Sequence, residues 1–252
     1  MEEFHHTVQL IDRVLVAENT VALFLSKPSG FSFVPGQHLE LIIPHPIETD
    51  GGRLCPHLWT GGGNKRDFSL ASAPYEKELV VAMRLRDSAF KRSLARIPLG
   101  DDLLIEGPFG SFRLHADTEK PAVFIAGGIG VAPFVSILRQ EAHDGFSRRI
   151  TFFYSNRRPE DAAFLKELQG LSQAQSTFMF VPTMTDLKDS QQVLVGEIGR
   201  ISKDMIAKYI PDRATSLYYS AGSPAMVAAM EKLLMDTGVS PENIRTEEFA
   251  GY

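Results

Sequence analysis

Cysteine is nearly absent from this chain of 252 residues, which contains one, Cys55. A single cysteine excludes a disulfide within the chain and an iron–sulfur cluster held by this chain's cysteines alone. Long apolar runs are absent too, because no stretch approaches the roughly 20 residues that a membrane helix needs. The first six residues, MEEFHH, are acidic and polar, which is not the pattern of a secretory signal. Together these absences favour a cytoplasmic protein.

An excess of basic residues is also missing. Lysine and arginine number 26 against 31 aspartates and glutamates, which gives a net charge of −5. This balance gives no support for nucleic-acid binding, and it disfavours a strongly acidic protein partner. The hydrophobic content of 44% and the charged content of 23% are typical of a globular protein. The length accommodates one large domain or two ordinary ones.

The first hundred residues have the pattern of β-structure, with short apolar runs separated by turn residues as in a sandwich or barrel. We expect strands at Val8–Val14, Thr20–Leu25, His38–Ile43, Phe68–Ser72, Leu79–Leu85 and Leu103–Glu106. Residues 44–65 have no periodicity and predict a long surface loop, which is a candidate lid over a site. It carries His45, Cys55 and His57, but without regular ligand spacing we predict no metal site. Asp87 offers a cap for a short helix over 87–93, whose N-terminus is suited to phosphate.

The second half alternates strand and helix, which predicts a doubly wound parallel sheet. We place a domain boundary in the polar stretch between Phe112 and Pro121, with domains at 1–114 and 120–252. Expected strands are Val123–Ala126, Arg149–Tyr154, Thr177–Pro182, Ser216–Ser220 and Asn243–Phe249, and expected helices are Pro133–His143, Pro159–Gln169, Lys203–Tyr209 and Ala225–Thr237. Ligands of such sheets bind at the carboxyl ends of the strands.

One turn in this half is rich in glycine and therefore has few side chains. Gly127, Gly128 and Gly130 follow an apolar strand and precede Pro133, where a helix begins. Unpaired backbone N–H groups of a first helical turn attract anions. The spacing differs from the standard G-x-G-x-x-G fingerprint, so an ordinary glycine-rich turn remains an alternative for this element alone. The turns at 155–158 and 221–224 fall on the same predicted rim, and three such turns together favour a ligand site.

The motifs in their order resemble those of the ferredoxin–NADP reductase superfamily, in which a flavin-binding Greek-key β-barrel precedes a nicotinamide-binding α/β domain. The segments that carry the resemblance are Arg66-Asp-Phe-Ser69, Gly107-Pro-Phe-Gly110, Gly127-Gly-Ile-Gly-Val-Ala-Pro133, Gly222-Ser-Pro-Ala-Met226 and Glu247-Glu-Phe249. The resemblance extends from Pro35 to Tyr252. Each segment is weak evidence alone, and their order and intervals make the resemblance strong.

The resemblance implies a set of flavin-binding residues in the barrel: Arg66, Asp67, Phe68, Ser69, Met83, Arg84, Phe90, Lys91 and Ser93. Arg66 would pair with a flavin phosphate, for which a guanidinium offers a bidentate contact. Phe68 stands where the family usually has tyrosine, so it can cover the isoalloxazine but offers no hydroxyl. These residues would contact the flavin along its length, including its pyrophosphate, which favours FAD over FMN.

The resemblance likewise implies nicotinamide-cofactor contacts in the second domain: Gly127, Gly128, Gly130, Ala132, Pro133, Ser155, Arg157, Arg158, Gly222, Ser223, Pro224 and Met226. Ser155, Arg157 and Arg158 match the position that reads the adenosine ribose. Two arginines there favour the 2′-phosphate of NADPH, although Asp161 nearby keeps NADH open.

Three residues are expected at the reacting edge of the flavin by the same resemblance. Ser69 would lie near N5, Phe249 would stack on the flavin face, and Glu247 belongs to the same C-terminal segment. Two departures from the family pattern bear on efficiency. Ala221 replaces the cysteine before Gly222, and three residues follow Phe249, which in the family is usually the terminal aromatic.

The sequence thus predicts an NAD(P)H-dependent FAD oxidoreductase that passes electrons to a separate acceptor. The acceptor is a ferredoxin, a flavodoxin, an oxygenase component or a small molecule, and the oligomeric state is left open. No paired carboxylates or Ser–His–Asp set is expected, because the flavin carries the chemistry. One alternative is a flavin-binding electron-transfer subunit that is inactive alone. A second is a non-enzymatic nucleotide sensor, which the complete Arg66–Ser69 motif disfavours.

Overall fold

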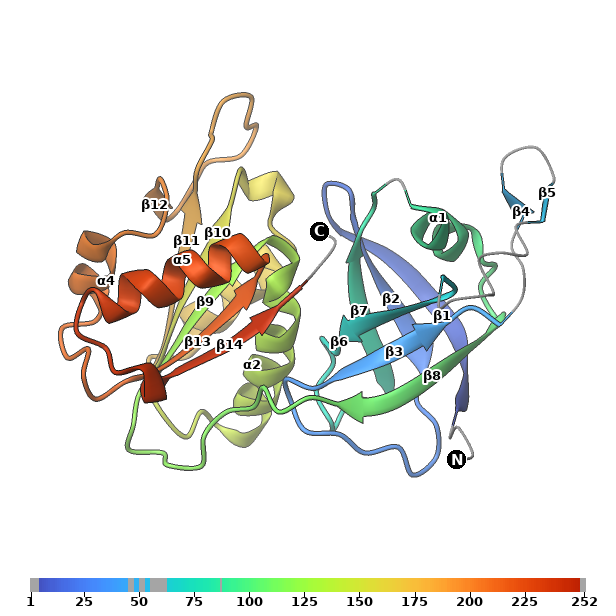
Figure 1. Ribbon diagram of the computed structural model, residues 1–252, viewed down its shortest axis with the longest axis horizontal. Coiled ribbons are helices and arrows are strands. Elements are labelled where there is room, and N and C mark those ends of the chain that lie inside the picture. The colour runs from blue at the N-terminus through green and yellow to red at the C-terminus, as the bar shows by residue number, and fades with distance from the viewer. Residues whose placement is uncertain (1–4, 45–47, 50–52, 55–62, 87, 250–252) are drawn as a thin grey trace.

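The computed structural model describes residues 5–44, 48–49, 53–54, 63–86 and 88–249. Two six-stranded sheets form two units that are joined by the segment 110–121 (Figure 1). The loop residues His45, Cys55 and His57 lie outside the described residues, as does Asp87. Within the described ranges no three histidine, cysteine or acidic side chains gather as metal ligands. No helix there has the length and apolar character needed to cross a membrane.

The first unit is a sheet with the strand order β6-β3-β8-β1-β2-β7, in which neighbouring strands pair antiparallel. Its strands are β1 (His6–Ala17), β2 (Thr20–Ser26), β3 (His38–Ile42), β6 (Lys65–Ser69), β7 (Glu78–Arg84) and β8 (Asp102–Phe109). A bridge between Leu70 and Val81 joins the two ends of this order, so the sheet closes into a barrel. The strand order departs from chain order as in a Greek key, and the predicted β-barrel is confirmed.

Alternation of apolar and polar residues explains the barrel core. Leu10, Leu23, Leu39 and Leu41 point inward and are fully buried. The helix α1 (Ala89–Arg96) covers one end of the barrel, and the hydroxyl of Ser88 caps it by accepting a hydrogen bond from the Lys91 N–H group. Two strands of two residues each, β4 (Glu48–Thr49) and β5 (Arg53–Leu54), pair antiparallel within the stretch predicted as a loop.

The second unit is a parallel sheet with the order β12-β11-β10-β9-β13-β14. Its elements are β9 (Ala122–Gly127), α2 (Ala132–Asp144), β10 (Ile150–Asn156), α3 (Leu165–Ala174), β11 (Phe178–Met184), β12 (Glu197–Ile198), α4 (Lys203–Tyr209), β13 (Leu217–Gly222), α5 (Pro224–Met235) and β14 (Ile244–Glu248). The order reverses between β9 and β13, which makes the carboxyl ends of these strands the switch point where such sheets bind ligands. The predicted doubly wound sheet is confirmed.

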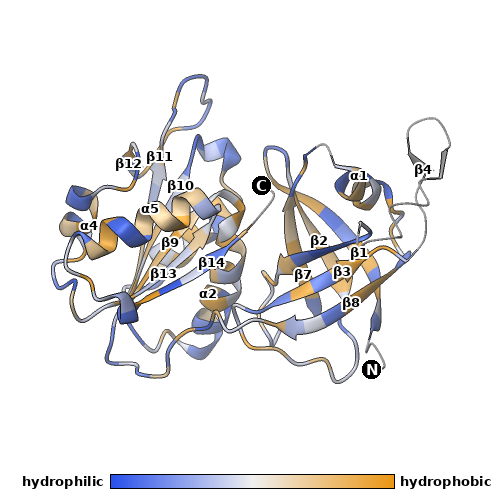
Figure 2. Cartoon of the chain, in the orientation of Figure 1, coloured by the Kyte–Doolittle hydropathy of each residue, from blue (hydrophilic) through white to orange (hydrophobic). Residues whose placement is uncertain are grey.

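The hydropathy of each strand of the parallel sheet agrees with its position, central or at the edge (Figure 2). The central strand β9 is apolar along its length and buried on both faces by helices. The edge strand β14 carries the hydrophilic sequence IRTEE, as expected of an edge that must not pair with other chains.

The two units meet along one interface, here called the seam, whose packed part is formed by helix α2 and the barrel residues 71–76 (Figure 1). The buried hydroxyl of Ser136 donates to the Ser72 carbonyl at 2.6 Å. Arg139 binds Glu167 and also reaches the Ala71 carbonyl at 3.3 Å. A single core cluster runs across the seam from barrel strands to α2. We keep 1–114 and 120–252 as the proposed domain limits.

Two expectations for the second half were wrong in detail. The helix predicted from Pro159 to Gln169 is a 3-10 turn at Pro159–Asp161 followed by α3, which starts at Leu165. Phe164 between them has a φ of 59°, in the left-handed region that interrupts a helix. The short strand β12 was not expected, because its two residues carry no apolar pattern.

Candidate active site at the seam

The glycine-rich turn lies at the switch point between β9 and β13. Gly128 has a φ of 55°, which favours glycine. A Cβ on Gly130 would overlap the carbonyl oxygen of Ala221 on β13, so glycine alone permits this approach. From the other neighbouring strand, the Tyr154 hydroxyl donates to the Gly128 carbonyl at 3.1 Å. The turn is therefore held from both sides and leads through the 3-10 turn Gly128–Val131 into α2, where Ala132 and Pro133 are buried.

The start of α5 packs against the same turn. Ser223 caps this helix by accepting a hydrogen bond from the Met226 N–H at 3.4 Å, and Pro224 occupies its first position. The Met226 thioether lies over Gly127, where a Cβ would overlap its sulfur. The N–H of Phe249 donates to the Gly222 carbonyl at 2.9 Å, which places the C-terminal aromatic beside the turn. Six of the predicted residues, on three separate segments, thus meet here.

A cleft of about 250 Å³ opens between these residues and the barrel. Its lining comprises Arg84, Arg86, Gly127, Gly128, Ile129, Gly130, Gly222, Ser223, Met226 and Phe249. We call it the glycine cleft. Its barrel side consists of two arginines, and its other side consists of bare backbone and small or apolar side chains.

The barrel side of the glycine cleft is strongly cationic. Burial lowers the pKa of Lys91, and the positive charges of Arg86, Arg66 and Arg84 lower it further, so the four cations lie close enough to repel one another. Arg84 and Arg86 form no ion pair with any described residue. A cation group of this kind is stable when an anion with several charges binds it.

The Arg66–Ser69 segment runs along β6 toward the seam. The Arg66 guanidinium lies 5.4 Å from the centroid of the Phe90 ring. Phe68 also packs on Phe90, with ring centroids 6.3 Å apart, and is almost fully buried in the barrel core. The buried Ser69 hydroxyl has no hydrogen-bond partner among the described residues. The structure therefore gives Phe68 a packing role, and its contact with an isoalloxazine ring stays a prediction.

The remaining predicted barrel residues differ in exposure. Met83 is fully buried in the barrel core, and Ser93 is a buried residue of α1. Asp67 is exposed on β6. The flavin contacts predicted for these three residues stay predictions.

A second cleft, of about 370 Å³, adjoins the first and also crosses the seam. Arg84 and Arg86 line both clefts, and opposite them lie Arg157, Arg158, Asp161, Asp186, Lys188 and Asp189. Ser155 precedes this group on β10. The turn predicted to read the adenosine ribose is thus at the seam, next to the glycine cleft.

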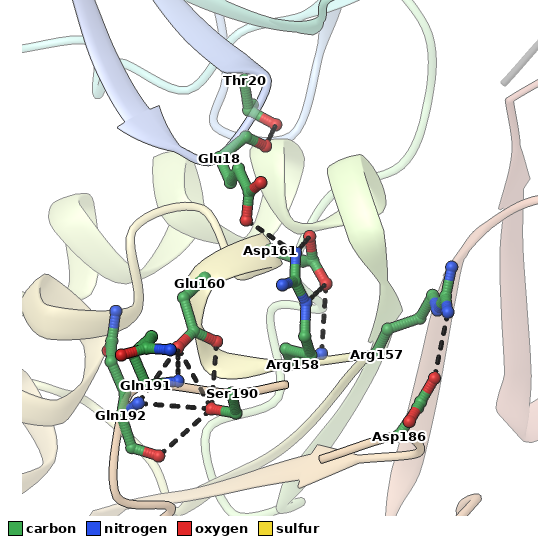
Figure 3. Close-up of polar contacts among 10 residues, drawn as sticks. All are labelled: Glu18, Thr20, Arg157, Arg158, Glu160, Asp161, Asp186, Ser190, Gln191 and Gln192. Atoms are coloured by element: carbon green, nitrogen blue, oxygen red, sulfur yellow. Dashed lines mark hydrogen bonds and ion pairs between the residues drawn. The ribbon is translucent and has the colours of Figure 1, made fainter. Parts of the chain in front are cut away.

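Both arginines of this turn are paired with carboxylates (Figure 3). Arg158 binds Asp161 at 3.1 Å and reaches across the seam to Glu18 of the β1–β2 turn at 2.6 Å. The bond to Asp161 holds the pKa of Arg158 above its usual range. The exposed Arg157 binds Asp186 at 2.9 Å, and this bond holds the pKa of Asp186 below its usual value. Arg158 therefore joins the two units, whereas Arg157 is held by one exposed ion pair.

Glu247 is the half-buried carboxyl of the site. It lies on β14 beside Ala221 of β13, and its side chain is 16% exposed. Burial raises its pKa to about 7. The facing side chain is His38 of β3, with Nδ1 at 3.8 Å from Oε1 of Glu247.

Comparison with known proteins agrees with this geometry. Residues 124–232 match the oxidoreductase NAD-binding domain family. The reductase component of propane 2-monooxygenase from Rhodococcus jostii is 30% identical over 229 residues, which cover 88% of this chain and 57% of that protein. Reductase component 2 of terephthalate 1,2-dioxygenase from Comamonas is 26% identical over 97% of this chain and 68% of its own length. The chain spans under two thirds of the length of the propane 2-monooxygenase components that it matches.

Solved structures give the same fold. A ferredoxin NADP⁺ reductase from Neisseria gonorrhoeae with bound FAD and NADP superposes with a TM-score of 0.75 at 22% identity, over 97% of this chain and 98% of that one. The cytochrome P450 reductase GcoB of Amycolatopsis has a TM-score of 0.77 at 24% identity, over 97% and 70%. The chain has the two-domain fold of the ferredoxin–NADP reductases, and its second domain matches the NAD-binding family of oxidoreductases.

Sequence reasoning missed two residues of the seam. Arg86 lines both clefts and belongs to the cation group, yet it follows a strand whose pattern ends before it. Its proximity in sequence to Arg84 is the signal that was available. His38 faces Glu247, and no sequence signal joins them, because 209 positions and a domain boundary separate the two.

Proposed function

We propose that this chain is an FAD-dependent NAD(P)H oxidoreductase that passes electrons to a separate protein. One observation carries the proposal: a cation group on the barrel faces a bare glycine turn on the parallel sheet across one cleft. The cation group fits the pyrophosphate of FAD, since Arg84 and Arg86 have no carboxylate partner among the described residues. The glycine turn fits the pyrophosphate of a nicotinamide cofactor.

The flavin, when bound, supplies the hydride-accepting chemistry. The chain's own residues bind and orient the two cofactors. Arg66, Arg84, Arg86 and Lys91 neutralise phosphate charge, and Gly127 to Gly130 allow close approach of a second phosphate group. The buried hydroxyl of Ser69 is available to donate a hydrogen bond to a ligand. Such preorganised contacts align the reacting atoms and keep water out.

For the electron acceptor we propose an oxygenase component or a ferredoxin. Relatives at 26–30% identity are reductase components of a monooxygenase and a dioxygenase. These relatives are longer than this chain, which supports a second reading in which the chain acts beside a further electron-transfer module. That module is either part of the same protein or a separate subunit.

The test is the absorbance spectrum of the purified protein, followed by anaerobic titration with NADPH and with NADH. We expect a bound flavin that bleaches on addition of one equivalent of nucleotide. Steady oxidation of NAD(P)H with ferricyanide then separates an enzyme that turns over by itself from a subunit that needs its partner. A colourless protein that binds no added FAD would contradict the proposal.

A further inference from the structure

Helix α2 connects the two segments that the proposed function assigns to the cofactors. It begins directly after the glycine turn, and it lies between the parallel sheet and the barrel (Figure 1). Ser136 follows Pro133 by about one helical turn and contacts Ser72 of the barrel. Ser72 in turn follows the Arg66–Ser69 segment by three positions. A short series of contacts therefore joins the two proposed phosphate sites through this helix.

The contact between Ser136 and Ser72 is a directional bond inside an apolar core. Both residues are fully buried, and the Ser136 hydroxyl donates to the Ser72 carbonyl at 2.6 Å. On the barrel side, the Ser72 hydroxyl accepts a hydrogen bond from the Val80 N–H at 3.0 Å, and the Ala71 N–H donates to the Val80 carbonyl at 2.7 Å. Apolar contacts alone leave a helix free to slide, whereas a hydrogen bond fixes both distance and direction. This bond therefore attaches α2 to a segment that is itself fixed on β7.

Arg139 makes a second contact across the seam, about one helical turn further along α2. Its guanidinium is held within the second unit by two bonds to Glu167 of α3, at 2.7 and 2.9 Å. One terminal nitrogen reaches the Ala71 carbonyl at 3.3 Å and the Glu76 carboxylate at 3.5 Å on the barrel. The Arg139 side chain is only 18% exposed, so little water competes for these contacts. Two contacts on successive turns fix both the position of α2 along the seam and its rotation.

This attachment matters for the reaction because hydride transfer depends steeply on alignment. A misplacement of about 1 Å costs on the order of 100-fold in rate. Phosphate contacts hold each cofactor to its own unit, so the alignment of the two rings depends on how the units are held together. We propose that Ser136 and Arg139 are positioning residues that set this alignment, an inference that rests on the proposed function. Neither residue touches a cofactor, and both act through the backbone of Ala71 and Ser72.

The kinetic test follows anaerobic flavin bleaching by saturating NAD(P)H in a single turnover. Ser136→Ala and Arg139→Gln should each lower the limiting rate by about tenfold or more, while the Kd values for FAD and for the nucleotide stay within about twofold of the wild type. The charge-transfer band of the flavin–nicotinamide complex should weaken in both variants, because it reports how the rings stack. A purely structural role would lower the melting temperature and leave the rate and the band of the folded protein unchanged. That result would overturn the proposal.

The matched control is Lys208→Gln, which removes an ion pair of 2.6 Å to Glu197 that lies entirely within the second unit. This control should bleach at the wild-type rate. A loss as large as in the two seam variants would also overturn the proposal, since the effect would not depend on the seam. A wild-type protein that binds FAD and is bleached by neither NADPH nor NADH would instead contradict the proposed function.

A second measurement depends neither on turnover nor on the cofactors. Nitroxide labels on Gln9→Cys of β1 and Gln173→Cys of α3, both exposed positions, report the distance between the two units by pulsed electron paramagnetic resonance. Cys55→Ser removes the native thiol from the labelled chain. The labelled parent should give one narrow distance distribution, and Ser136→Ala or Arg139→Gln should broaden it by about twofold or more or shift its centre. The ion-pair control should leave it unchanged. An equally narrow and unshifted distribution in both seam variants would show that other contacts hold the units in place, and would overturn the proposal.

Discussion

The protonation of Glu247 links the chemistry of the seam to stability. Its pKa is raised to about 7 in the folded chain, whereas an exposed glutamate titrates near 4.3. Between these values the folded chain holds a proton that the unfolded chain has lost. Stability is therefore greatest below the lower value, falls as pH rises toward 7 and stays low above it.

This linkage predicts that Glu247→Gln stabilises the protein at pH 8. The amide has no charge to bury, so the free energy of unfolding should rise by as much as about 3 kcal/mol at pH 8 and change little at pH 4. Urea denaturation at the two pH values measures it. The exposed neighbour Glu248→Gln is the control. An equal effect of Glu247→Gln at both pH values would contradict the linkage.

Arg66 is the residue whose loss should remove the flavin. Its guanidinium lies beside the Phe90 ring within the cation group, where a bound phosphate would accept charge-assisted hydrogen bonds. Arg66→Ala should weaken FAD binding by roughly 2–4 kcal/mol, or about 30- to 1,000-fold. Fluorescence titration of the flavin-free protein with FAD measures the Kd. The exposed Arg149→Ala on the other unit should bind FAD like the wild type. A variant at Arg66 that is purified with its full complement of flavin would remove this residue from the site.

At the residue scale, local motifs were predictable and contacts across the seam were not. Gly127, Gly130 and Met226 stand in short segments whose spacing alone indicates a strand–turn–helix unit, and they meet in one cleft. The ion pair from Arg158 to Glu18 joins positions 140 apart, and no pattern in either segment indicates it. Sequence reasoning therefore placed Arg158 at the ligand turn but could not find the carboxylates that hold it.

At the scale of elements, the prediction succeeded wherever a period in the sequence was long enough to identify an element. The strands β9, β10 and β13 are apolar runs, and the observed bounds differ from the expected ones by one or two residues. The start of α3 was missed because Pro159 begins a 3-10 turn and Phe164 adopts a left-handed φ that its residue type does not indicate. Tertiary packing of Phe164 beside Arg139 accompanies this conformation.

The glycine turn allows a prediction that separates close approach from backbone conformation. Gly130→Ala should lower the free energy of unfolding by more than about 2 kcal/mol, because its Cβ would collide with the backbone of Ala221. Urea denaturation measures this loss. Gly128→Ala meets no atoms and should lose only about 1 kcal/mol for its positive φ. Gly170→Ala in the middle of α3 also meets nothing and should gain roughly 0.5–1 kcal/mol. If Gly130→Ala proved as stable as Gly128→Ala, the contact between turn and β13 would not restrict this position.

On the scale of the whole molecule, the seam makes the two units one binding surface. The larger core cluster continues from barrel residues such as Ala22 and Val80 into α2, and Arg84 and Arg86 line both clefts. Cofactors bound to the two units would therefore meet without a large domain movement. Selectivity between cofactors then depends on charges from both sides of the seam.

This arrangement makes the two arginines of the ribose turn separable. Arg157→Ala should raise the KM for NADPH by roughly tenfold or more relative to NADH, since NADPH alone has the 2′-phosphate. Arg158→Ala should in addition lower thermal stability, because Glu18 loses its partner across the seam and the half-buried Asp161 loses its partner within the same turn. Steady-state kinetics with both nucleotides and thermal melts measure these effects. Equal changes in both KM values for the double variant would mean that the pair is structural and that NADH is the donor.

The position of Phe249 predicts how access to the reacting face is controlled. Its N–H is fixed by the Gly222 carbonyl, and its half-buried ring lines the glycine cleft with Met226. If the ring covers the flavin face that nicotinamide needs, it must move before the two cofactors can stack, and it competes by roughly 0.5–1.5 kcal/mol. Phe249→Ser should therefore bind NADPH and NADH more tightly, by about 2- to 12-fold, and prefer NADPH less. Turnover falls if release of the nucleotide becomes limiting. Titrations that follow the long-wavelength charge-transfer band measure both Kd values.

Phe249→Tyr keeps a ring in place and should behave like the wild type. An unchanged band with unchanged Kd values in Phe249→Ser would show that another residue gates the face.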